Sequence, residues 1–311
     1  MKDYCVLYFC DEGLHVETCF SMASLAKFAS ESLEIVFLQQ GYSKALPQTL
    51  IDYIVSRGHR VVVEEFNASE IRGVNVSNPD FGKNGITNTA FGKVDAINTL
   101  IDDYRWIFYL DGDILFLGDP KFSSITGFNQ PIGACLDLAE SSGYWNASFF
   151  ENCKENQRSS EYFNSGFLCV NSAVWRLINV KECYLQNVQK HSDECPYMLH
   201  CNCFDQCPLN MTFDGRWAIL TPSLNVQRCV LHTRLWDKAL MRHYTGGRHK
   251  FLPILRRRCD RREYRLLCEI SSVCDHSTGI RFYDWGLSNF LNRIRRWKVV
   301  KVMNEYVDSL L

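Results

Sequence analysis

The chain has 311 residues, a hydrophobic content of 46% and a formal net charge of −1 at pH 7. This composition supplies a sizeable core and excludes an intrinsically disordered protein. No stretch approaches the roughly 18 to 20 continuous apolar residues of a transmembrane helix, and the N-terminus lacks a secretory signal pattern. Many of the 15 cysteines lie in apolar runs, and their odd number argues against a complete disulfide set. We therefore expect a cytoplasmic protein with reduced thiols.

Positive charge is concentrated near the C-terminus. Residues 242–301 hold 15 Lys and Arg against 5 Asp and Glu. Such a basic segment indicates anionic partners, which could be phosphates, a membrane surface or nucleic acid. The alternative is contact with the acidic remainder of the same protein.

The N-terminal third alternates predicted strands with predicted helices. Apolar runs predict strands at 4–10, 34–38 and 60–66, and helical patterns fall at 17–29 and 50–57. This alternation predicts a mainly parallel sheet with right-handed crossovers. The polar segment 67–86 is typical of a surface loop, and 87–103 has a helical pattern.

The middle of the chain continues the pattern. The apolar run 105–117 predicts a buried strand, further strands are predicted at 131–136 and 163–170, and 173–189 has a helical pattern. A polar, aromatic insertion occupies 141–161.

The most informative motif is Asp111-Gly112-Asp113, near the end of the apolar run. The carboxyl ends of strands are where open α/β sheets bind ligands, and paired carboxylates suit a hard divalent ion such as Mn²⁺ or Mg²⁺. Such an ion would bind substrate phosphates, and Gly112 would let the backbone approach a ligand closely. The motif therefore points to nucleotide-sugar chemistry, with capping of the next turn as the alternative.

Over roughly residues 3–250 the chain resembles the retaining glycosyltransferases of family 8. Phe163-Asn164-Ser165-Gly166 is similar to the family's F-N-[AS]-G segment, and the segment 205–210 is similar to its D-Q-x-x-L-N. Leu224-Asn225 also fits the family pattern. The resemblance implies an α/β, GT-A type nucleotide-diphospho-sugar transferase fold, with a mainly parallel central sheet flanked by helices. Residues 1–255 would form this catalytic domain, and 256–311 a basic, aromatic C-terminal helical extension.

The resemblance also implies roles for single residues. Asp11 would contact the nucleotide and Lys93 the nucleotide sugar, while Asp137 would bind the sugar. The implied catalytic residues are Gln206, Asp205 and Asp137. The implied nucleotide-sugar-binding residues are Asp11, Lys93, Asp111, Gly112, Asp113, Asn164, Ser165, Gly166, Gly246, Arg248 and Lys250.

The segment His243-Tyr244-Thr245-Gly246 resembles the family's H-[FY]-x-G. The resemblance implies that His243 completes a metal site for Mn²⁺ or Mg²⁺ with Asp111 and Asp113. His232 competes for this role but lacks the Tyr-x-Gly context.

One part of this region departs from the family pattern. The family's pyrophosphate-binding lysine lies six residues after the histidine, where this chain has His249. Arg248 and Lys250 therefore both remain candidates for the phosphate contact.

Thiols and imidazoles between positions 191 and 207 could form a second metal site. The candidates are His191, Cys195, His200, Cys201, Cys203 and Cys207. Their spacing matches neither a paired C-x-x-C site nor a zinc finger, so we expect reduced thiols.

Together these features predict a metal-dependent retaining hexosyl- or pentosyltransferase. It would move a sugar from a nucleoside diphosphate sugar, UDP being the family's usual nucleotide, to a hydroxyl on a glycan, glycolipid or glycoprotein. The cation would neutralise charge on the departing diphosphate. We expect attack on the same face as the leaving group, and Asp205 as a covalent nucleophile stays open.

Two other functions remain as alternatives. A phosphatase of the haloacid dehalogenase type also carries D-x-D after an apolar strand. A non-catalytic protein could bind sugar or nucleic acid through its basic tail, although we expect no nucleic acid partner. Alternating aromatic and basic residues at 281–298 leave open a peripheral membrane contact or a helix packed on the domain.

Overall fold

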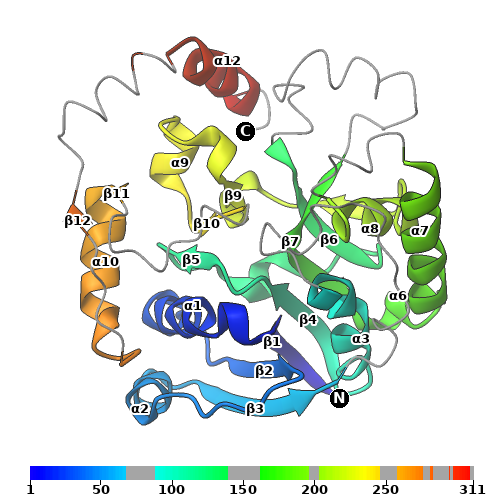
Figure 1. The fold of residues 1–311 in the computed structure, drawn as a ribbon, viewed down its shortest axis with the longest axis horizontal. Coiled ribbons are helices and arrows are strands. Elements are labelled where there is room, and N and C mark those ends of the chain that lie inside the picture. The colour runs from blue at the N-terminus through cyan, green and yellow to red at the C-terminus, as the bar shows by residue number, and fades with distance from the viewer. Residues whose placement is uncertain are drawn as a thin grey trace.

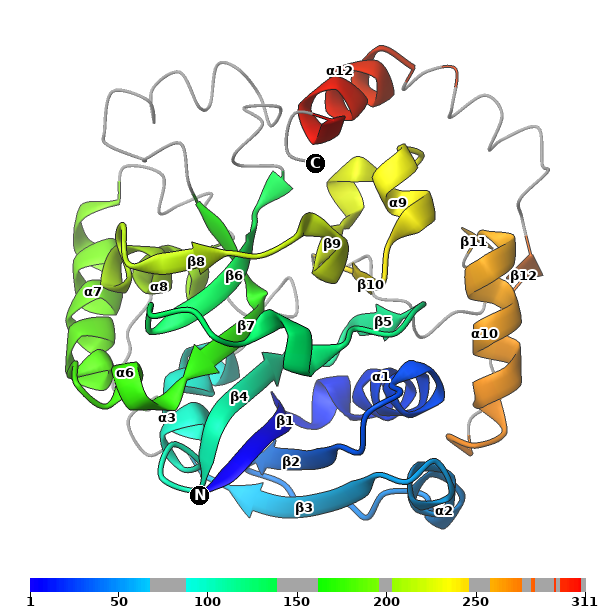
Figure 2. The same cartoon turned by 180° about the vertical axis from the view of Figure 1, so that it is seen from behind.

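The computed structural model describes residues 1–67, 88–138, 162–195, 203–245, 258–275, 281–282, 294 and 297–308. Its centre is a seven-stranded sheet with the strand order β3-β2-β1-β4-β7-β6-β8 (Figures 1 and 2). The strands of this sheet are β1 (Lys2–Cys10), β2 (Glu34–Gln40), β3 (Arg60–Phe66), β4 (Tyr104–Leu110), β6 (Ile132–Leu136), β7 (Phe163–Asn171) and β8 (Trp217–Ile219). Two smaller sheets are formed by β5 (Ile114–Phe116), β10 (Met241–His243) and β9 (Val226–Gln227), and by β11 (Arg258–Cys259) and β12 (Arg281–Phe282).

The central sheet is mainly parallel, as predicted. β1 runs parallel to β2 and β4, β2 to β3, and β6 to β8. Only β7 is antiparallel to its neighbours, β4 and β6. Because β1 and β4 are parallel neighbours, their carboxyl ends meet at one edge of the sheet, which is where the D-x-D motif lies.

Helices cover both faces of this sheet. The helices are α1 (His15–Phe28), α2 (Gln48–Ser56), α3 (Lys93–Asn98), α6 (Ser172–Trp175), α7 (Val180–Glu194), α8 (Gln206–Thr212), α9 (Arg234–Lys238), α10 (Arg261–Ser271) and α12 (Trp297–Asp308). α1, α2 and α10 lie on one side, and α3, α6, α7 and α8 on the other (Figures 1 and 2).

The two faces of the sheet contribute to two hydrophobic clusters. Along β1, Val6 and Tyr8 join the cluster under α1, whereas Cys5 and Leu7 join the cluster under α3. Successive side chains of a strand point to opposite faces, so a sheet covered on both faces has continuously apolar strands. This explains why the sequence shows apolar runs and not an alternation of apolar and polar residues.

The apolar run 105–117 is not one strand. β4 ends at Leu110, Asp111 to Asp113 form a turn, and β5 pairs antiparallel with β10 in the second sheet. The register places Ile114 opposite His243. The D-x-D motif therefore connects two sheets, and this connection brings the second sheet's histidine to it.

Two predicted helices differ from the structure. In the predicted helix 87–103, of which the structure describes 88–103, the described residues form the short α3, preceded by a 3₁₀ helix at Asn88–Gly92. The segment 173–189 is divided into α6 and α7, because the Asn179 side chain accepts a hydrogen bond from the backbone N–H of Glu182 and starts a new helix there. The predicted insertion 141–161, and all but the first residue of the predicted loop 67–86, lie outside the described residues.

The C-terminal extension adds to the core. α10 packs against α1, and its Leu266, Leu267 and Ile270 belong to the same hydrophobic cluster as α1. The predicted domain boundary at 255 lies outside the described residues and stays a prediction. Across the described part of the chain, we find no helix with the length and apolarity needed to span a bilayer.

Candidate active site

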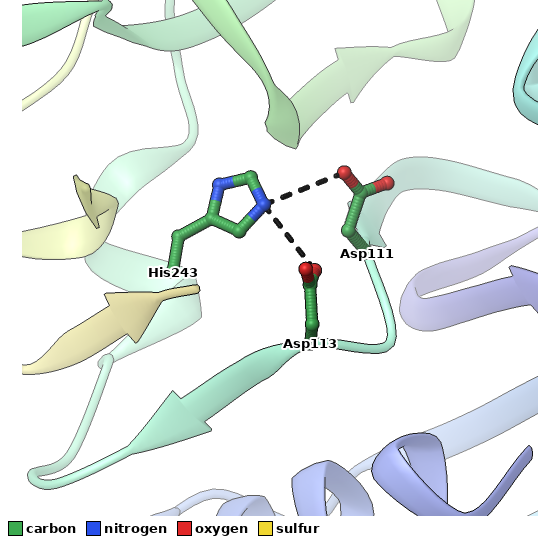
Figure 3. Close-up of side chains that lie close together, drawn as sticks. All are labelled: Asp111, Asp113 and His243. Carbon is green, nitrogen blue, oxygen red and sulfur yellow. Dashed lines mark ion pairs between the residues drawn. The ribbon is translucent and has the colours of Figure 1, made fainter. Parts of the chain in front are cut away.

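The two sheets bring three potential metal ligands together. Nε2 of His243, at the end of β10, lies 3.3 Å from Oδ1 of Asp113 and 3.6 Å from Oδ2 of Asp111 (Figure 3). Among the described residues, this is the only group of three His, Cys, Asp or Glu side chains whose ligand atoms all lie within 4.8 Å of one another. Two carboxylates and one imidazole are a donor set that suits Mn²⁺ or Mg²⁺. The residues predicted to bind metal therefore fit a divalent cation.

Burial strengthens the electrostatic interactions of Asp113 and His243. Asp113 is 2% exposed and His243 5% exposed, so water screens their charges poorly. Oδ1 of Asp111 also accepts a hydrogen bond of 2.8 Å from the Tyr109 hydroxyl. Burial and the negative charge of Asp111 raise the pKa of Tyr109 well above its ordinary value, which keeps this hydroxyl a donor.

The competing histidine lies elsewhere. His232 lines a pocket of about 540 Å³ between α9 and α12, together with Trp297 and Asn304. The structure thus places His243, and not His232, beside the two aspartates.

Close packing explains why positions 112 and 166 are occupied by glycine. A Cβ atom at Gly112 would overlap Oγ1 of Thr18 on α1. A Cβ atom at Gly166 would overlap the imidazole of His243. Gly112 therefore packs closely on α1, and Gly166 makes room for the histidine. The close approach of Gly112 to a ligand stays a prediction.

Lys93 lies between Asp111, a potential metal ligand, and Asp205, one of the predicted catalytic residues. Its ammonium is 2.6 Å from Oδ2 of Asp205, 3.8 Å from Oδ1 of Asp111 and 3.2 Å from Oγ of Ser165. Burial alone would lower the pKa of Lys93, but the carboxylates of Asp111 and Asp205 outweigh it and raise the pKa above 10.5. Lys93 is therefore a permanent positive charge in the site.

Amide and carboxylate groups form a second cluster next to Lys93. Nδ2 of Asn164 donates to Oδ2 of Asp137 and to Oε1 of Gln206, both at 3.0 Å. Nε2 of Gln206 donates to the same Asp137 oxygen at 3.1 Å. These groups offer both donors and acceptors, which is what the hydroxyls of a sugar require. The structure thus brings Asp137, Asn164, Ser165, Asp205 and Gln206 together.

Asp11 lies at the carboxyl end of β1, next to β4. Its carboxylate accepts hydrogen bonds from the backbone N–H of Gly13 at 3.0 Å and from the Thr89 hydroxyl at 3.1 Å. Asp11 is therefore at the same edge of the sheet as Asp111, and its contact with Thr89 links it to the 3₁₀ helix that precedes α3.

Some predicted positions cannot be placed. Gly246, Arg248 and Lys250 lie outside the described residues, as do His200 and Cys201. Within the part of the chain that the structure describes, His191 and its neighbouring cysteines form no three-ligand group. Burial lowers the pKa of His191, but hydrogen bonds with the thiols of Cys195 and Cys207 outweigh this effect and raise it to about 9.

Sequence reasoning missed one group at the site and one buried ion pair beside it. Tyr109, in β4, donates a hydrogen bond to Asp111, which directly follows the end of that strand. The two-residue spacing is a signal for this contact, because side chains two apart in an extended chain share a face. Arg242, next to His243, is almost fully buried and pairs with Asp260 and Glu263 at the start of α10. That pairing joins distant segments, and no spacing in the sequence indicates it.

Comparison with known proteins gives a family and a fold. The family described as "Glycosyl transferase family 8" matches residues 5–250. Among curated proteins, General stress protein A of Bacillus subtilis (strain 168) is 26% identical over 150 residues, which cover 47% of this chain and 48% of that protein. The chain thus matches about half the length of this relative.

Several solved glycosyltransferase structures share the fold of this chain, although their sequence identity to it is low. The galactosyltransferase LgtC, in complex with donor and acceptor sugar analogues, has a TM-score of 0.60 and 18% identity, over 78% of this chain and 87% of that one. GlyE of Streptococcus pneumoniae TIGR4 has a TM-score of 0.55 and 17% identity, over 88% and 63%. Mouse xyloside xylosyltransferase 1 has a TM-score of 0.52 and 15% identity, over 78% and 97%. These are GT-A folds, and this chain shares that architecture.

Proposed function

The chain belongs to glycosyl transferase family 8 and is a glycosyltransferase, and from this premise we propose the reaction that its site performs. The proposed reaction is the transfer of a sugar from a nucleoside diphosphate sugar, a UDP-sugar in the first instance, to a hydroxyl of a glycan, glycolipid or glycoprotein. We propose that it requires Mn²⁺ or Mg²⁺ and retains the anomeric configuration of the donor.

The observation that carries this proposal is the contact between two unlike clusters. Asp111, Asp113 and His243 form a compact, negatively charged group, and Asn164 and its neighbours form a buried hydrogen-bonding group. Nδ1 of His243 lies 3.0 Å from Oδ1 of Asn164, so the two groups adjoin. A nucleoside diphosphate sugar needs this pair of environments, because its diphosphate is anionic and its sugar is rich in hydroxyls.

Asp111, Asp113 and His243 would hold the cation, which when bound supplies positive charge to the departing diphosphate. Asp137, Asn164 and Gln206 would orient the sugar hydroxyls through their amide and carboxylate groups.

Asp205 is held in a way that disfavours covalent catalysis. Its carboxylate pairs with Lys93 at 2.6 Å and accepts a hydrogen bond of 3.1 Å from Oγ of Ser165. A carboxylate whose charge is compensated in this way is a weakened nucleophile. We propose that the acceptor attacks from the face of the leaving group, through an ion-pair-like state, and that a leaving-group oxygen takes the acceptor's proton. Asp205 would then position Lys93 and stabilise positive charge at the anomeric carbon.

Three finer predictions stay open beside this proposal. Arg248 or Lys250 would contact the diphosphate, but both lie outside the described residues. Membrane contact through the extension and a cytoplasmic location also stay predictions. The phosphatase and non-catalytic alternatives are not favoured, because the family match covers residues 5–250.

Turnover of a panel of UDP- and GDP-sugars, with and without Mn²⁺, tests the proposal. The matched variant is Asp113→Asn, which keeps the size of the side chain and removes its charge. We expect hydrolysis or transfer of one donor in the parent, stimulated by Mn²⁺ and lost in the variant. Turnover that is equal with and without metal, or equal in the variant, would contradict the proposed metal dependence. If no donor in the panel is turned over in any metal, the proposed donor class is wrong.

A further inference from the structure

His243 is held at its second ring nitrogen by two buried amides. Nδ1 lies 3.0 Å from Oδ1 of Asn164 and 3.1 Å from Oδ1 of Asn225. Asn225 is completely buried and directly precedes β9, which pairs in parallel with the strand that carries His243. The small second sheet therefore fixes the position of Asn225 relative to the imidazole.

The hydrogen bonds determine which atom of each amide faces the ring. Oδ1 of Asn164 accepts from the backbone N–H of Gly166 at 3.1 Å, and its Nδ2 donates to Asp137. A backbone N–H can only donate and a carboxylate can only accept, so the Asn164 amide has one orientation. Nδ2 of Asn225 donates to Oδ1 of Asn164 at 2.9 Å, which leaves Oδ1 of Asn225 facing His243.

Two carbonyl-type oxygens thus face Nδ1, and neither can donate a proton. The imidazole must therefore carry a proton on Nδ1, and a neutral ring has its lone pair on Nε2. Nε2 is the atom that faces Asp111 and Asp113. Outer hydrogen bonds of this kind fix the tautomer and the ring plane of metal-binding histidines.

We propose that Asn225 is a positioning residue for His243, which selects the Nδ1-protonated tautomer and directs Nε2 to the cation. This inference rests on the proposed function, because it assumes that His243 binds the cation. Asn225 is a cleaner probe than Asn164, since Asn164 also bonds with Asp137 and Gln206 in the proposed sugar site.

Mn²⁺ binding to the donor-free protein, followed by the electron paramagnetic resonance signal of free Mn²⁺, tests the proposal. Asn225→Leu keeps the volume and removes the acceptor, whereas Asn225→Asp keeps an acceptor oxygen. Gln227→Leu is the matched control. Gln227 is buried to a similar extent and is the strand partner of His243, but the described hydrogen bonds of its amide go to the backbone of Leu136, Leu138 and Asn225 and none goes to the imidazole.

We expect Asn225→Leu to bind Mn²⁺ about 10 to 100 times more weakly than the parent. Asn225→Asp should recover part of this loss, because it keeps an acceptor for Nδ1 of His243 but loses the donor to Oδ1 of Asn164. Gln227→Leu should unfold at a lower temperature and still bind Mn²⁺ like the parent. A folded Asn225→Leu with parental affinity, or an Asn225→Asp as weak as Asn225→Leu, would overturn the proposal.

A second measurement does not depend on the folding of any Asn225 variant. The ¹⁵N shifts of the His243 ring in the parent report its tautomer, and we expect the proton on Nδ1. A proton on Nε2 of the neutral ring would overturn the proposal. A parent that binds no Mn²⁺ would overturn both the metal requirement and this inference, whereas parental binding by Asn225→Leu would overturn the inference alone.

Discussion

A Cβ atom on Gly166 would lie 2.6 Å from Nδ1 and 2.9 Å from Nε2 of His243, and closer still to Cε1. Only a residue without a side chain leaves room for the imidazole beside β7. The backbone carbonyl of Gly166 also accepts a 2.8 Å hydrogen bond from the N–H of Asp111. Gly166 thus adjoins two of the three potential metal ligands.

Gly166→Ala should therefore displace His243 and weaken Mn²⁺ binding by roughly 10 to 100-fold, the range seen when groups supporting a metal ligand are removed. Isothermal titration with Mn²⁺ measures this effect. Gly133→Ala is a suitable control, because its Cβ would meet the Phe128 ring at 2.8 Å and none of the three potential metal ligands is among its near neighbours. The control should lose stability and keep its affinity for Mn²⁺, and equal losses of affinity in both variants would contradict this account.

Gly112→Ala should disturb the D-x-D turn through a clash with Thr18. Because the clash is with Oγ1, and Cβ of Thr18 would remain 3.3 Å away, Thr18→Ala should rescue the variant. The readout is donor turnover in Gly112→Ala and in the double variant. If Gly112 were instead needed for close approach to a ligand, the double variant would stay as inactive as the single one.

Lys93→Met should leave Asp205 without its described ion-pair partner in a poorly hydrated site. Removing one partner of a buried pair costs about 3–5 kcal/mol, so we expect a loss of this order in the free energy of unfolding, measured with urea. Lys181→Met is the control, since Lys181 pairs with Asp95 at 3.0 Å but its side chain is 38% exposed, against 3% for Lys93. Its loss should stay below about 1 kcal/mol, and losses of similar size in the two variants would show that Lys93 is not paired as described.

The ion pair between Arg242 and Asp260 should make stability depend on pH. Burial alone would raise the pKa of Asp260, but the Arg242 guanidinium outweighs it and holds the pKa below 3.8. The stabilisation is therefore present above pH 3.8 and is lost as the pH falls through the lower value of the folded state.

Asp260→Asn keeps a good N-cap for α10 and removes the charge. We expect it to cost roughly 1.5–3 kcal/mol at neutral pH, the range for hydrogen bonds to charged groups. The difference in unfolding free energy between parent and variant should shrink as the pH is lowered below 3.8. A difference that does not change with pH would mean that the carboxylate's charge has no part in it.

The sequence allowed much of the fold to be predicted, because its signals are local. β3 was predicted at its observed bounds, and the N-terminal alternation of strands and helices predicted the parallel half of the sheet. The run 105–117 was misread as one strand, because apolarity alone does not distinguish a strand that continues from two strands in different sheets. The turn at Gly112 leaves no room for a Cβ atom beside Thr18 of α1, which is distant in sequence.

The residues of the site were predicted mainly through family resemblance. The structure adds the strand pairings that bring these residues together. The pairing of β5 with β10 brings His243 to Asp113, and the pairing of β9 with β10 brings Asn225 to His243. Neither pairing leaves a periodic signal in the sequence, because these strands are only two or three residues long.

We propose that a cation held by Asp111, Asp113 and His243 connects the protein to a nucleoside diphosphate. The most direct test is calorimetric titration of UDP into the parent and into Asp113→Asn, each with and without Mn²⁺. We predict that Mn²⁺ strengthens UDP binding to the parent and has no effect on the variant. If UDP binds the parent equally well without Mn²⁺, or if Mn²⁺ strengthens binding to the variant as much as to the parent, the proposed role of this site is wrong.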